Sequence, residues 1–336
     1  MRVGFNPNRD KLLLTSEYLH QIIIPVYIPE LEGYFKESFA ILKLCLESLF
    51  VTIHKQTFVT IVNNGSDLIV ADYLDCLLKQ NKIHELIHTQ NIGKLNSILK
   101  GLVGNNIELV TIADSDVLFL NHWQEETVNV FNLVPKAGVV GIVPQLKTYQ
   151  SNCGNVLFDN IFNSKLRFVP VKNKEALIRF YDSIGWKRDY NPDYLKYNLG
   201  LKIRQDKIVL LGSGHFVATY KKDIFEEITS YIGFKMGGCS EGYLDKAPLE
   251  KDYWRLTTYD NYAYHMGNKL ENWMIVPQIL ANNEVQFNYN FTKNDIINPI
   301  SYWIKNKLFV KFFTVKFLVN IFLRWKKLPK EMISKY

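Results

Sequence analysis

Asp114 and Asp116 are the two residues whose types and spacing best suit a chemical role in this sequence. Ser115 separates them, and the apolar run Glu108–Ala113 before them predicts a buried strand that ends at Asp114. Proteins typically hold Mg²⁺ and Mn²⁺ through one or two carboxylates together with the phosphates of a substrate. We therefore expect the pair to bind a divalent cation; the alternative is an ordinary solvated turn.

Residues suited to binding a ligand also lie at the ends of two other predicted strands. Pro25 and Tyr27 lie at the end of His20–Tyr27, and Asn64 follows Phe58–Val62 in a turn. In open α/β sheets, ligands bind beyond the carboxyl ends of the strands. Clusters at three such ends therefore predict one shared ligand pocket.

Strand-like and helix-like segments alternate along the first 145 residues, which indicates an α/β fold with a mostly parallel, doubly wound central sheet flanked by helices. Residues 146–207 are rich in Asn, Tyr and Lys and predict an irregular, substrate-facing segment. An apolar stretch, Ile208–Tyr220, and a helix near Lys222–Tyr231 are expected next. The other expected strands are Ile83–His88 and Val139–Val143, and the expected helices are Leu31–Phe50, Leu68–Leu78 and Leu95–Leu102.

The net charge of +7 is concentrated near the end of the sequence. Residues 305–330 contain eight lysines and arginines and no acid, so the rest of the chain has 32 bases and 33 acids. A nearly neutral body argues against a nucleic-acid-binding protein, whose basic face would normally lie on the folded domain. We expect two halves of one catalytic unit, residues 1–145 and 146–270, followed by a basic extension over residues 271–336.

The extension contains a segment, Leu308–Trp325, that is apolar over most of its surface when drawn as a helix. One stripe of it is polar or basic, formed by Lys316, Asn320, Arg324 and Lys327. This pattern is typical of helices that lie in an anionic membrane interface, so we expect residues 300–330 to bind such a surface. The alternative is a helix that packs onto the catalytic domain or onto a partner subunit.

The sequence shows no signal-peptide pattern and no apolar run long enough to span a membrane. Four widely spaced cysteines favour a reducing compartment over a disulfide framework. We therefore expect a cytoplasmic protein that is peripheral at the cytoplasmic face of the membrane, with homo-oligomers left open. The cysteines are Cys45, Cys76, Cys153 and Cys239.

His84, Glu85 and His88 match the H-E-x-x-H pattern, which binds zinc when it lies on a helix. The segment overlaps a predicted strand, and no third histidine follows at the spacing of the extended motif. A zinc peptidase is therefore a minor alternative, which a strand at residues 83–88 would exclude.

Taken in order, the motifs resemble glycosyltransferase family 2, whose members have the GT-A fold. The resemblance covers roughly residues 20–270. Its pieces are IIIPVY (22–27), VNNGS (62–66), NIGKLNS (91–97), IADSDV (112–117), GSGHFVATYKKDIFEEI (212–228), PLEKDYWRL (248–256) and YAYHMGN (262–268).

This resemblance implies a nucleotide-sugar site in the first half of the chain. Pro25 and Tyr27 would line the nucleobase pocket, and Asn64 stands where the family usually has an Asp that contacts the base or ribose. The residues that would border the ribose and diphosphate are Asn91, Gly93, Lys94 and Asn96.

The resemblance also implies a metal site. Asp114 and Asp116 would hold Mn²⁺ or Mg²⁺ and the donor diphosphate, with Ser115 beside the donor. His265 would complete the metal site or contact a phosphate; the alternative is a hydrogen-bonded core histidine.

Glu250 and Asp252 are the carboxylates that the resemblance implies for catalysis. In an inverting transfer the acceptor hydroxyl must lose its proton as it attacks the anomeric carbon, and a positioned carboxylate can accept that proton. Lys251 lies between the two acids, which departs from the family motif. The alternative is a solvated helix start after Pro248.

Together these observations predict an inverting, metal-dependent glycosyltransferase. It would move a sugar from a nucleotide donor, with UDP favoured, to a saccharide or lipid-linked saccharide in bacterial surface polysaccharide biosynthesis. The departures at Asn64 and Lys251 favour a second hypothesis, a catalytically silent nucleotide-sugar-binding or scaffold subunit of a membrane assembly.

Overall fold

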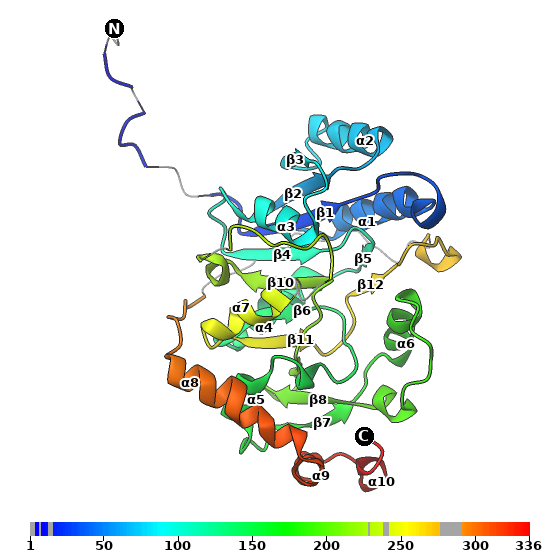
Figure 1. Cartoon of the computed structure of the whole chain (residues 1–336), viewed down its shortest axis with the longest axis vertical. Coiled ribbons are helices and arrows are strands. Elements are labelled where there is room, and N and C mark those ends of the chain that lie inside the picture. Colours follow the sequence, from blue (N-terminus) through cyan, green and yellow to red (C-terminus); the bar gives the residue numbers. More distant parts are fainter. Residues whose placement is uncertain (1–3, 7, 13–15, 228, 238–241, 276–290) are drawn as a thin grey trace.

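A computed structural model gives the fold of the chain (Figure 1). It describes residues 4–6, 8–12, 16–227, 229–237, 242–275 and 291–336. A ten-stranded sheet runs through the molecule in the order β3-β2-β1-β4-β10-β6-β11-β9-β8-β7. Its strands are β1 (His20–Val26), β2 (Thr57–Asn64), β3 (Glu85–Thr89), β4 (Leu109–Ala113), β6 (Ala137–Gly141), β7 (Leu166–Pro170), β8 (Tyr197–Lys202), β9 (Ile208–Leu211), β10 (Val217–Lys221) and β11 (Trp254–Thr258).

The sheet is parallel where the sequence predicted a doubly wound fold. β3, β2, β1 and β4 run side by side in one direction, and β6 and β11 are parallel to each other. β10 is antiparallel to both β4 and β6, and β9, β8 and β7 complete the sheet as antiparallel neighbours. The chain builds outward from β1 to β3 and then returns to β4, so a crevice for a ligand forms at the carboxyl ends of β1 and β4.

Helices cover the two faces of the parallel part, as the alternation of side chains along β1 requires. Ile22 and Ile24 pack with α1 (Ser38–Thr52) and α2 (Leu68–Lys79), whereas Ile23 packs with α3 (Lys94–Leu102). The remaining helices are α4 (Trp123–Leu133), α5 (Gly154–Asn160), α6 (Lys174–Ser183), α7 (Gly242–Glu250), α8 (Pro299–Trp303), α9 (Lys316–Trp325) and α10 (Lys330–Ile333).

A small second sheet lies beside the crevice. β5 (Val117–Phe119) follows the Asp114–Asp116 segment and pairs in antiparallel fashion with β12 (Ala263–His265). In this register His265 lies opposite Val117. The pairing therefore brings a histidine from late in the sequence next to the aspartates.

Residues 146–231 are more regular than the sequence analysis expected. The stretch expected to be irregular contains α5, β7, α6 and β8, and the helix expected near Lys222–Tyr231 is only a short 3₁₀ turn at Lys222–Phe225. β7 is the edge strand and is only partly buried, whereas β8 is buried from Asn198 to Leu201 although it contains polar residues and a glycine. Elements of five to seven residues with this composition resemble loops in the sequence.

The tail is helical but is not one helix. A helical stretch continues from α8 through Ile304–Leu308 and Phe309–Thr314, and the extended backbone of Val315 separates it from α9. Phe322 and Leu323 of α9 are buried in the same core as Phe168 of β7, so the tail packs on the body of the protein. Within the described residues, none of the helices has the length and apolar character needed to cross a membrane.

Candidate functional site

A cavity of about 520 Å³ lies at the carboxyl ends of β1, β2 and β4. The structure brings eight of the residues predicted for the donor or the metal to its wall. They are Pro25, Tyr27, Asn64, Asn91, Lys94, Asp114, Ser115 and Asp116. Tyr34, Phe35, Lys235 and Met236 also line it, and the motifs gave no signal for these four.

Asn64 supports the wall of the cavity through the next loop. Its Oδ1 accepts a hydrogen bond of 2.9 Å from the backbone N–H of Ile92, and the side chain is buried. Gly65 has φ +85°, and a Cβ there would come within 2.9 Å of the backbone nitrogen of Asn91. The Asn-Gly turn after β2 therefore fixes the loop that carries Asn91 into the cavity.

Gly93 and Asn96, two other predicted donor-site residues, are not part of the cavity wall. Asn96 donates to the carbonyl oxygen of Ile232 (2.8 Å) and accepts from its N–H (2.9 Å). A Cβ on Gly93 would lie 2.8 Å from the carbonyl oxygen of Phe234. Both residues therefore hold the segment that brings Lys235 and Met236 to the cavity.

Lys94 and Asp114 form an ion pair on the cavity wall. The Lys94 Nζ lies 2.6 Å from Oδ1 and 2.8 Å from Oδ2 of Asp114. Both side chains are mostly buried, with about a fifth of each exposed (19% and 23%). A single ammonium group thus already neutralises one of the two aspartates.

The negative charge of Asp116 is neutralised less completely than that of Asp114. Burial raises the pKa of its carboxyl to about 6, the negative charge of Asp114 adds to the rise, and His265 and Lys94 oppose it. Its Oδ1 is buried and has no hydrogen-bond partner in the described part of the chain. The site is therefore short of positive charge at Asp116.

The hydrogen bonds around His265 indicate which ring nitrogen faces Asp116. The hydroxyl of Ser183 donates to the carbonyl oxygen of Phe180 (2.7 Å), and a hydroxyl has only one hydrogen to give. Ser183 Oγ must therefore accept its second bond, of 3.0 Å, from the Nδ1–H of His265. The other nitrogen, Nε2, points at Oδ2 of Asp116 from 3.4 Å.

With the proton of His265 on Nδ1, the lone pair of Nε2 faces the Oδ2 atom of Asp116, and these two electron-rich atoms require a proton or a cation between them. A metal-bound histidine typically donates its other N–H to a neighbouring acceptor, as His265 does to Ser183. In the described residues no three Asp, Glu, His or Cys side chains converge into a ready-made cage. Asp116 and His265 nevertheless fit a divalent cation whose remaining ligands come from substrate phosphates.

A larger cavity of about 1010 Å³ adjoins the first and shares Lys94, Asp114 and Asp116 with it. Its wall includes Trp186, Asp245 and Arg255, and the motifs did not single out these residues. Asp245 lies on the first turns of α7 and pairs with the Arg255 guanidinium. The enclosed space therefore extends from the aspartates toward α6 and α7.

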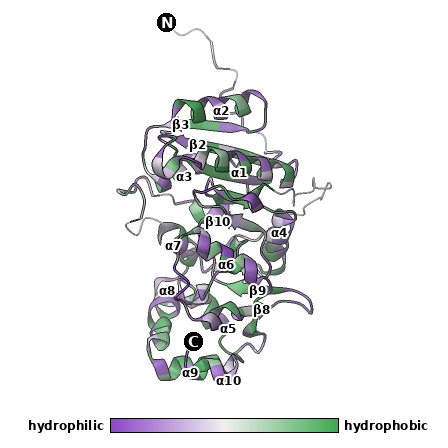
Figure 2. Cartoon of the chain, turned by 90° about the vertical axis from the view of Figure 1, so that its right-hand side faces the viewer, coloured by the Kyte–Doolittle hydropathy of each residue, from purple (hydrophilic) through white to green (hydrophobic). Residues whose placement is uncertain are grey.

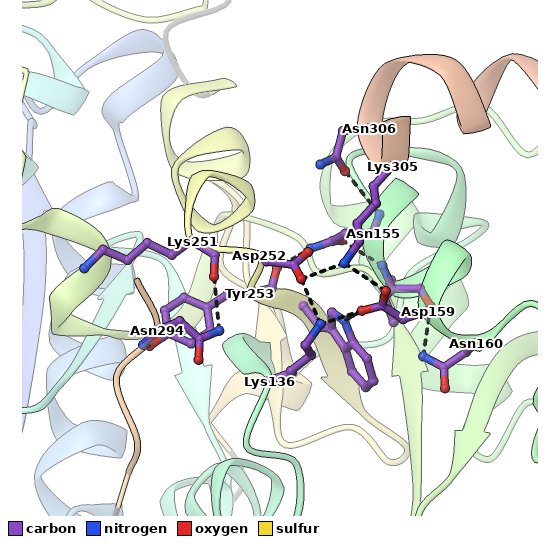
Figure 3. Close-up of polar contacts among 12 residues, drawn as sticks. Lys136, Asn155, Asp159, Asn160, Lys251, Asp252, Tyr253, Asn294, Lys305 and Asn306 are labelled. Atoms are coloured by element: carbon purple, nitrogen blue, oxygen red, sulfur yellow. Dashed lines mark hydrogen bonds and ion pairs between the residues drawn. The ribbon is translucent and has the colours of Figure 1, made fainter. Parts of the chain in front are cut away.

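Glu250 and Asp252 lie elsewhere. Glu250 lines a separate cavity beside Lys246 and Tyr302, away from the aspartates. Asp252 accepts hydrogen bonds from Lys136 (2.8 Å) and Lys305 (2.7 Å) in a cluster of ion pairs (Figure 3). Neither carboxylate therefore lines the two cavities that contain Asp114. Glu250 lines its own cavity, and Asp252 is bonded to Lys305 of the tail.

The H-E-x-x-H segment does not form a zinc helix. Glu85–Thr89 is strand β3, and His84 precedes it and accepts a hydrogen bond from the backbone N–H of Val59. The Nδ1 of His88 bonds to the side chain of Asn63 (2.9 Å). The zinc-peptidase alternative is therefore excluded, because the motif lies on a strand and not on a helix.

Comparison with known proteins gives matches only among solved structures: no family model and no curated protein matches the sequence. S. aureus TarS (1–349) in complex with UDP-GlcNAc is 12% identical over 91% of this chain and 72% of that chain, with a TM-score of 0.45. Without that ligand, the same fragment is 13% identical over 73% of this chain and 60% of that one, with a TM-score of 0.43.

The mannosyltransferase PcManGT from Pyrobaculum calidifontis, in complex with GDP-Man and Mn²⁺, is a further match. It is 13% identical over 74% of this chain and 56% of that chain, with a TM-score of 0.40. This chain thus spans only about 60% of the length of the TarS fragment in one match and 56% of PcManGT. The structures that this chain is similar to therefore include a glycosyltransferase and a protein bound to a nucleotide sugar.

Proposed function

We propose that the protein is an inverting, metal-dependent glycosyltransferase that uses a nucleotide-sugar donor. One observation carries the proposal: Asp114 and Asp116, which follow β4, and Lys94, the first residue of α3, lie where two cavities meet. The smaller cavity has the size and the charged groups for a nucleoside diphosphate, and the larger one leaves room for an acceptor. The sugar would sit at the junction, next to the aspartates.

The residues of the smaller cavity fit the parts of such a donor. Tyr27 is 38% exposed, and its ring meets Phe35 edge-on with centroids 5.9 Å apart, so the two offer an apolar surface to a base. Lys94 and Lys235 supply positive charge for the diphosphate. We infer a UDP-linked donor from the family resemblance of the sequence.

Asp116 and His265 would hold Mn²⁺ or Mg²⁺. A cation there, when bound, would stabilise negative charge on the departing nucleoside diphosphate. Ser183 would keep Nε2 of His265 free for this task through its hydrogen bond to Nδ1. Without a donor, Lys94 neutralises Asp114. The same ammonium would contact the phosphates of a bound donor.

We propose Asp245 as the general base, in place of Glu250 or Asp252. It is an acid of the larger cavity, where an acceptor hydroxyl would lie, and Arg255 fixes its orientation. As the acceptor oxygen attacks the anomeric carbon, the bond from that carbon to the diphosphate breaks and the bonding electrons leave with the nucleotide. The hydroxyl proton passes to the Asp245 carboxylate.

We further propose that the acceptor is a saccharide or lipid-linked saccharide of bacterial surface polysaccharide biosynthesis, and that the protein works at the cytoplasmic face of the membrane. The wide cavity around Trp186 supports a saccharide, because half of this indole is exposed (50%) and offers a flat face to a sugar ring.

A thermal-shift panel of nucleoside diphosphates with and without Mn²⁺ tests the donor proposal. A ligand that binds only the folded protein raises its melting temperature by mass action. We expect a shift with a nucleoside diphosphate that grows when Mn²⁺ is present and shrinks in Asp116→Asn. Mn²⁺-dependent binding without any sugar transfer or donor hydrolysis would instead favour the silent binding subunit.

A further inference from the structure

The outer half of helix α9 is exposed although the helix packs on the body of the protein. Phe322 and Leu323 face the core, whereas Phe317, Ile321 and Trp325 recur every fourth residue on the opposite side. Their exposed fractions are 70%, 47% and 47%. We call these three residues the α9 outer face. Three large apolar side chains on one exposed stripe mark an interaction surface.

A residue from a distant part of the sequence extends this surface. Phe162, which follows α5, is 87% exposed, and its ring centroid lies 5.7 Å from that of Trp325. The helical stretch before α9 adds Trp303 (51% exposed) and Phe312 (54%). Figure 2 shows hydrophobic and hydrophilic residues interleaved along these helices, at the end of the molecule farthest from β3.

The charged residues of the tail before α10 have one sign, and Glu331 on α10 is the first acid after them. No Asp or Glu occurs from residue 296 to 330, and eight Lys or Arg do. Two of the eight are committed to the fold: Lys305 lies in the ion-pair cluster, and Lys326 is buried and donates to the carbonyl oxygen of Ile161 (2.6 Å). The six exposed cations are Lys307, Lys311, Lys316, Arg324, Lys327 and Lys330.

Ion pairs and a hydrogen bond hold the first part of the tail on the body of the protein. Lys305 Nζ lies 2.7 Å from Asp252 and 2.9 Å from Asp159, and Lys136 bridges the same two carboxylates from 2.8 and 2.7 Å (Figure 3). The backbone N–H of Asn155 donates to Oδ1 of Asn306, at 3.1 Å. The exposed surface is therefore held in a fixed orientation relative to the two cavities.

We propose that the α9 outer face and Phe162 form one composite surface that docks on an anionic lipid bilayer. Aromatic and aliphatic side chains would enter the headgroup region while the six cations face lipid phosphates. A second copy of the chain is a poorer occupant, because two faces that each carry six exposed cations and a single neighbouring acid, Glu331, would repel. This inference is independent of sugar transfer, since lipid binding needs no turnover.

Flotation of the full chain with vesicles tests the proposal. We expect binding to vesicles of equal parts phosphatidylcholine and phosphatidylglycerol, weaker binding to pure phosphatidylcholine, and loss of binding in high salt. Phe317→Ser with Trp325→Ser should weaken binding at least about tenfold. Lys316→Gln with Arg324→Gln should weaken it about 30-fold, and only for the anionic vesicles.

Phe162→Ser is the most discriminating variant. Residue 162 lies outside the amphipathic tail in sequence, so the tail alone does not predict an effect of this substitution on vesicle binding. We expect it to weaken vesicle binding about fivefold. Leu68→Ser is the matched control: Leu68 is 78% exposed on α2, near the opposite edge of the sheet, and its loss should leave binding unchanged. Unaltered melting temperatures would show that the variants fold.

Three outcomes would overturn the proposal. Phe162→Ser could bind vesicles like the unaltered chain, binding could show no preference for anionic lipid, or Phe317→Ser with Trp325→Ser could convert a dimer into a monomer without an effect on vesicles. Asp116→Asn separates this proposal from the catalytic one, because it should abolish sugar transfer and leave vesicle binding intact. Deletion of residues 300–336 is not a usable test, since it would also remove Phe322 and Leu323 from the core.

Discussion

Lys94 neutralises Asp114 from within the chain, with its ammonium nitrogen 2.6 Å and 2.8 Å from the two carboxylate oxygens. Asp116, two positions further along the chain, has no ammonium partner at such a distance among the described residues, and its pKa is raised to about 6 chiefly by burial. The two aspartates therefore have different electrostatic surroundings. In the proposed function, Asp116 would therefore be the aspartate that takes a cation from solution.

Lys94→Met should weaken the affinity for a nucleoside diphosphate by about tenfold to a hundredfold, because it removes a charge-assisted contact and leaves Asp114 without its cation. Isothermal titration with UDP and Mn²⁺ measures this. Lys100→Met, at an exposed position on the same helix, is the control and should bind normally. Equal affinities for the two variants would remove Lys94 from the donor site.

Ser183→Ala should weaken Mn²⁺ binding through His265 without touching the ion. The hydroxyl orients the imidazole, and loss of an outer-shell partner typically costs about 10–100-fold in metal affinity. Mn²⁺ titration followed by electron paramagnetic resonance reports the affinity directly. His265→Gln should weaken it further. A purely structural role for Ser183 would lower the melting temperature and leave the Mn²⁺ affinity unchanged.

Asp245→Asn should lower kcat by about 10²–10⁴-fold with little effect on donor affinity, because the amide cannot accept the acceptor proton. Glu250→Gln and Asp252→Asn should keep most of the activity per folded molecule, since neither residue lines the two cavities. The measurement is steady-state transfer with saturating donor. A large loss of kcat in Glu250→Gln and none in Asp245→Asn would restore the assignment that the sequence motif implies.

The ion-pair cluster under the tail should make stability depend on pH. Burial opposes ionisation of Asp159, but hydrogen bonds from Lys136 and Lys305 outweigh it and lower the pKa of this carboxyl below 3.8. The ionised Asp159 carboxylate therefore stabilises the folded protein fully above pH 3.8. This stabilisation is lost as the pH falls through the lowered pKa that Asp159 has in the folded protein.

Asp159→Asn should accordingly reduce the free energy of unfolding by about 1–3 kcal/mol near neutral pH, and the difference from the unaltered chain should shrink in acid. Urea unfolding at several pH values measures it. Asp72→Asn, on an exposed part of α2, should change stability by less than about 0.5 kcal/mol. A difference for Asp159→Asn that does not vary with pH would contradict the cluster's role.

The first half of the fold could be predicted from sequence because its strands are continuous apolar runs that alternate with helix-like segments. β1, β2 and β4 are buried along their whole length or nearly so, and the residues after them meet at one sheet edge by the geometry of parallel strands. β7 and β8 could not be predicted, because they mix polar, charged and apolar residues with a proline or a glycine, which is the composition of loops.

The candidate site was predicted in part for the same reason. Asp114 and Asn64 occupy strand ends, so local pattern places them, whereas Asp245 reaches the cavity only through the packing of α7. Glu250 and Asp252 match a motif in spacing, but Glu250 lines a separate cavity and Asp252 is paired with Lys305 of the tail. Contacts between residues so distant in the sequence leave no local signal.

The most direct measurement is the release of nucleoside diphosphate from a UDP-sugar panel with Mn²⁺, compared between the unaltered chain and Asp116→Asn. The account predicts Mn²⁺-dependent release by the unaltered chain, and loss of that release in a variant that melts at the same temperature or higher, because a buried charge has been removed. Full activity in a folded Asp116→Asn variant would contradict the metal-dependent transfer proposed for this site.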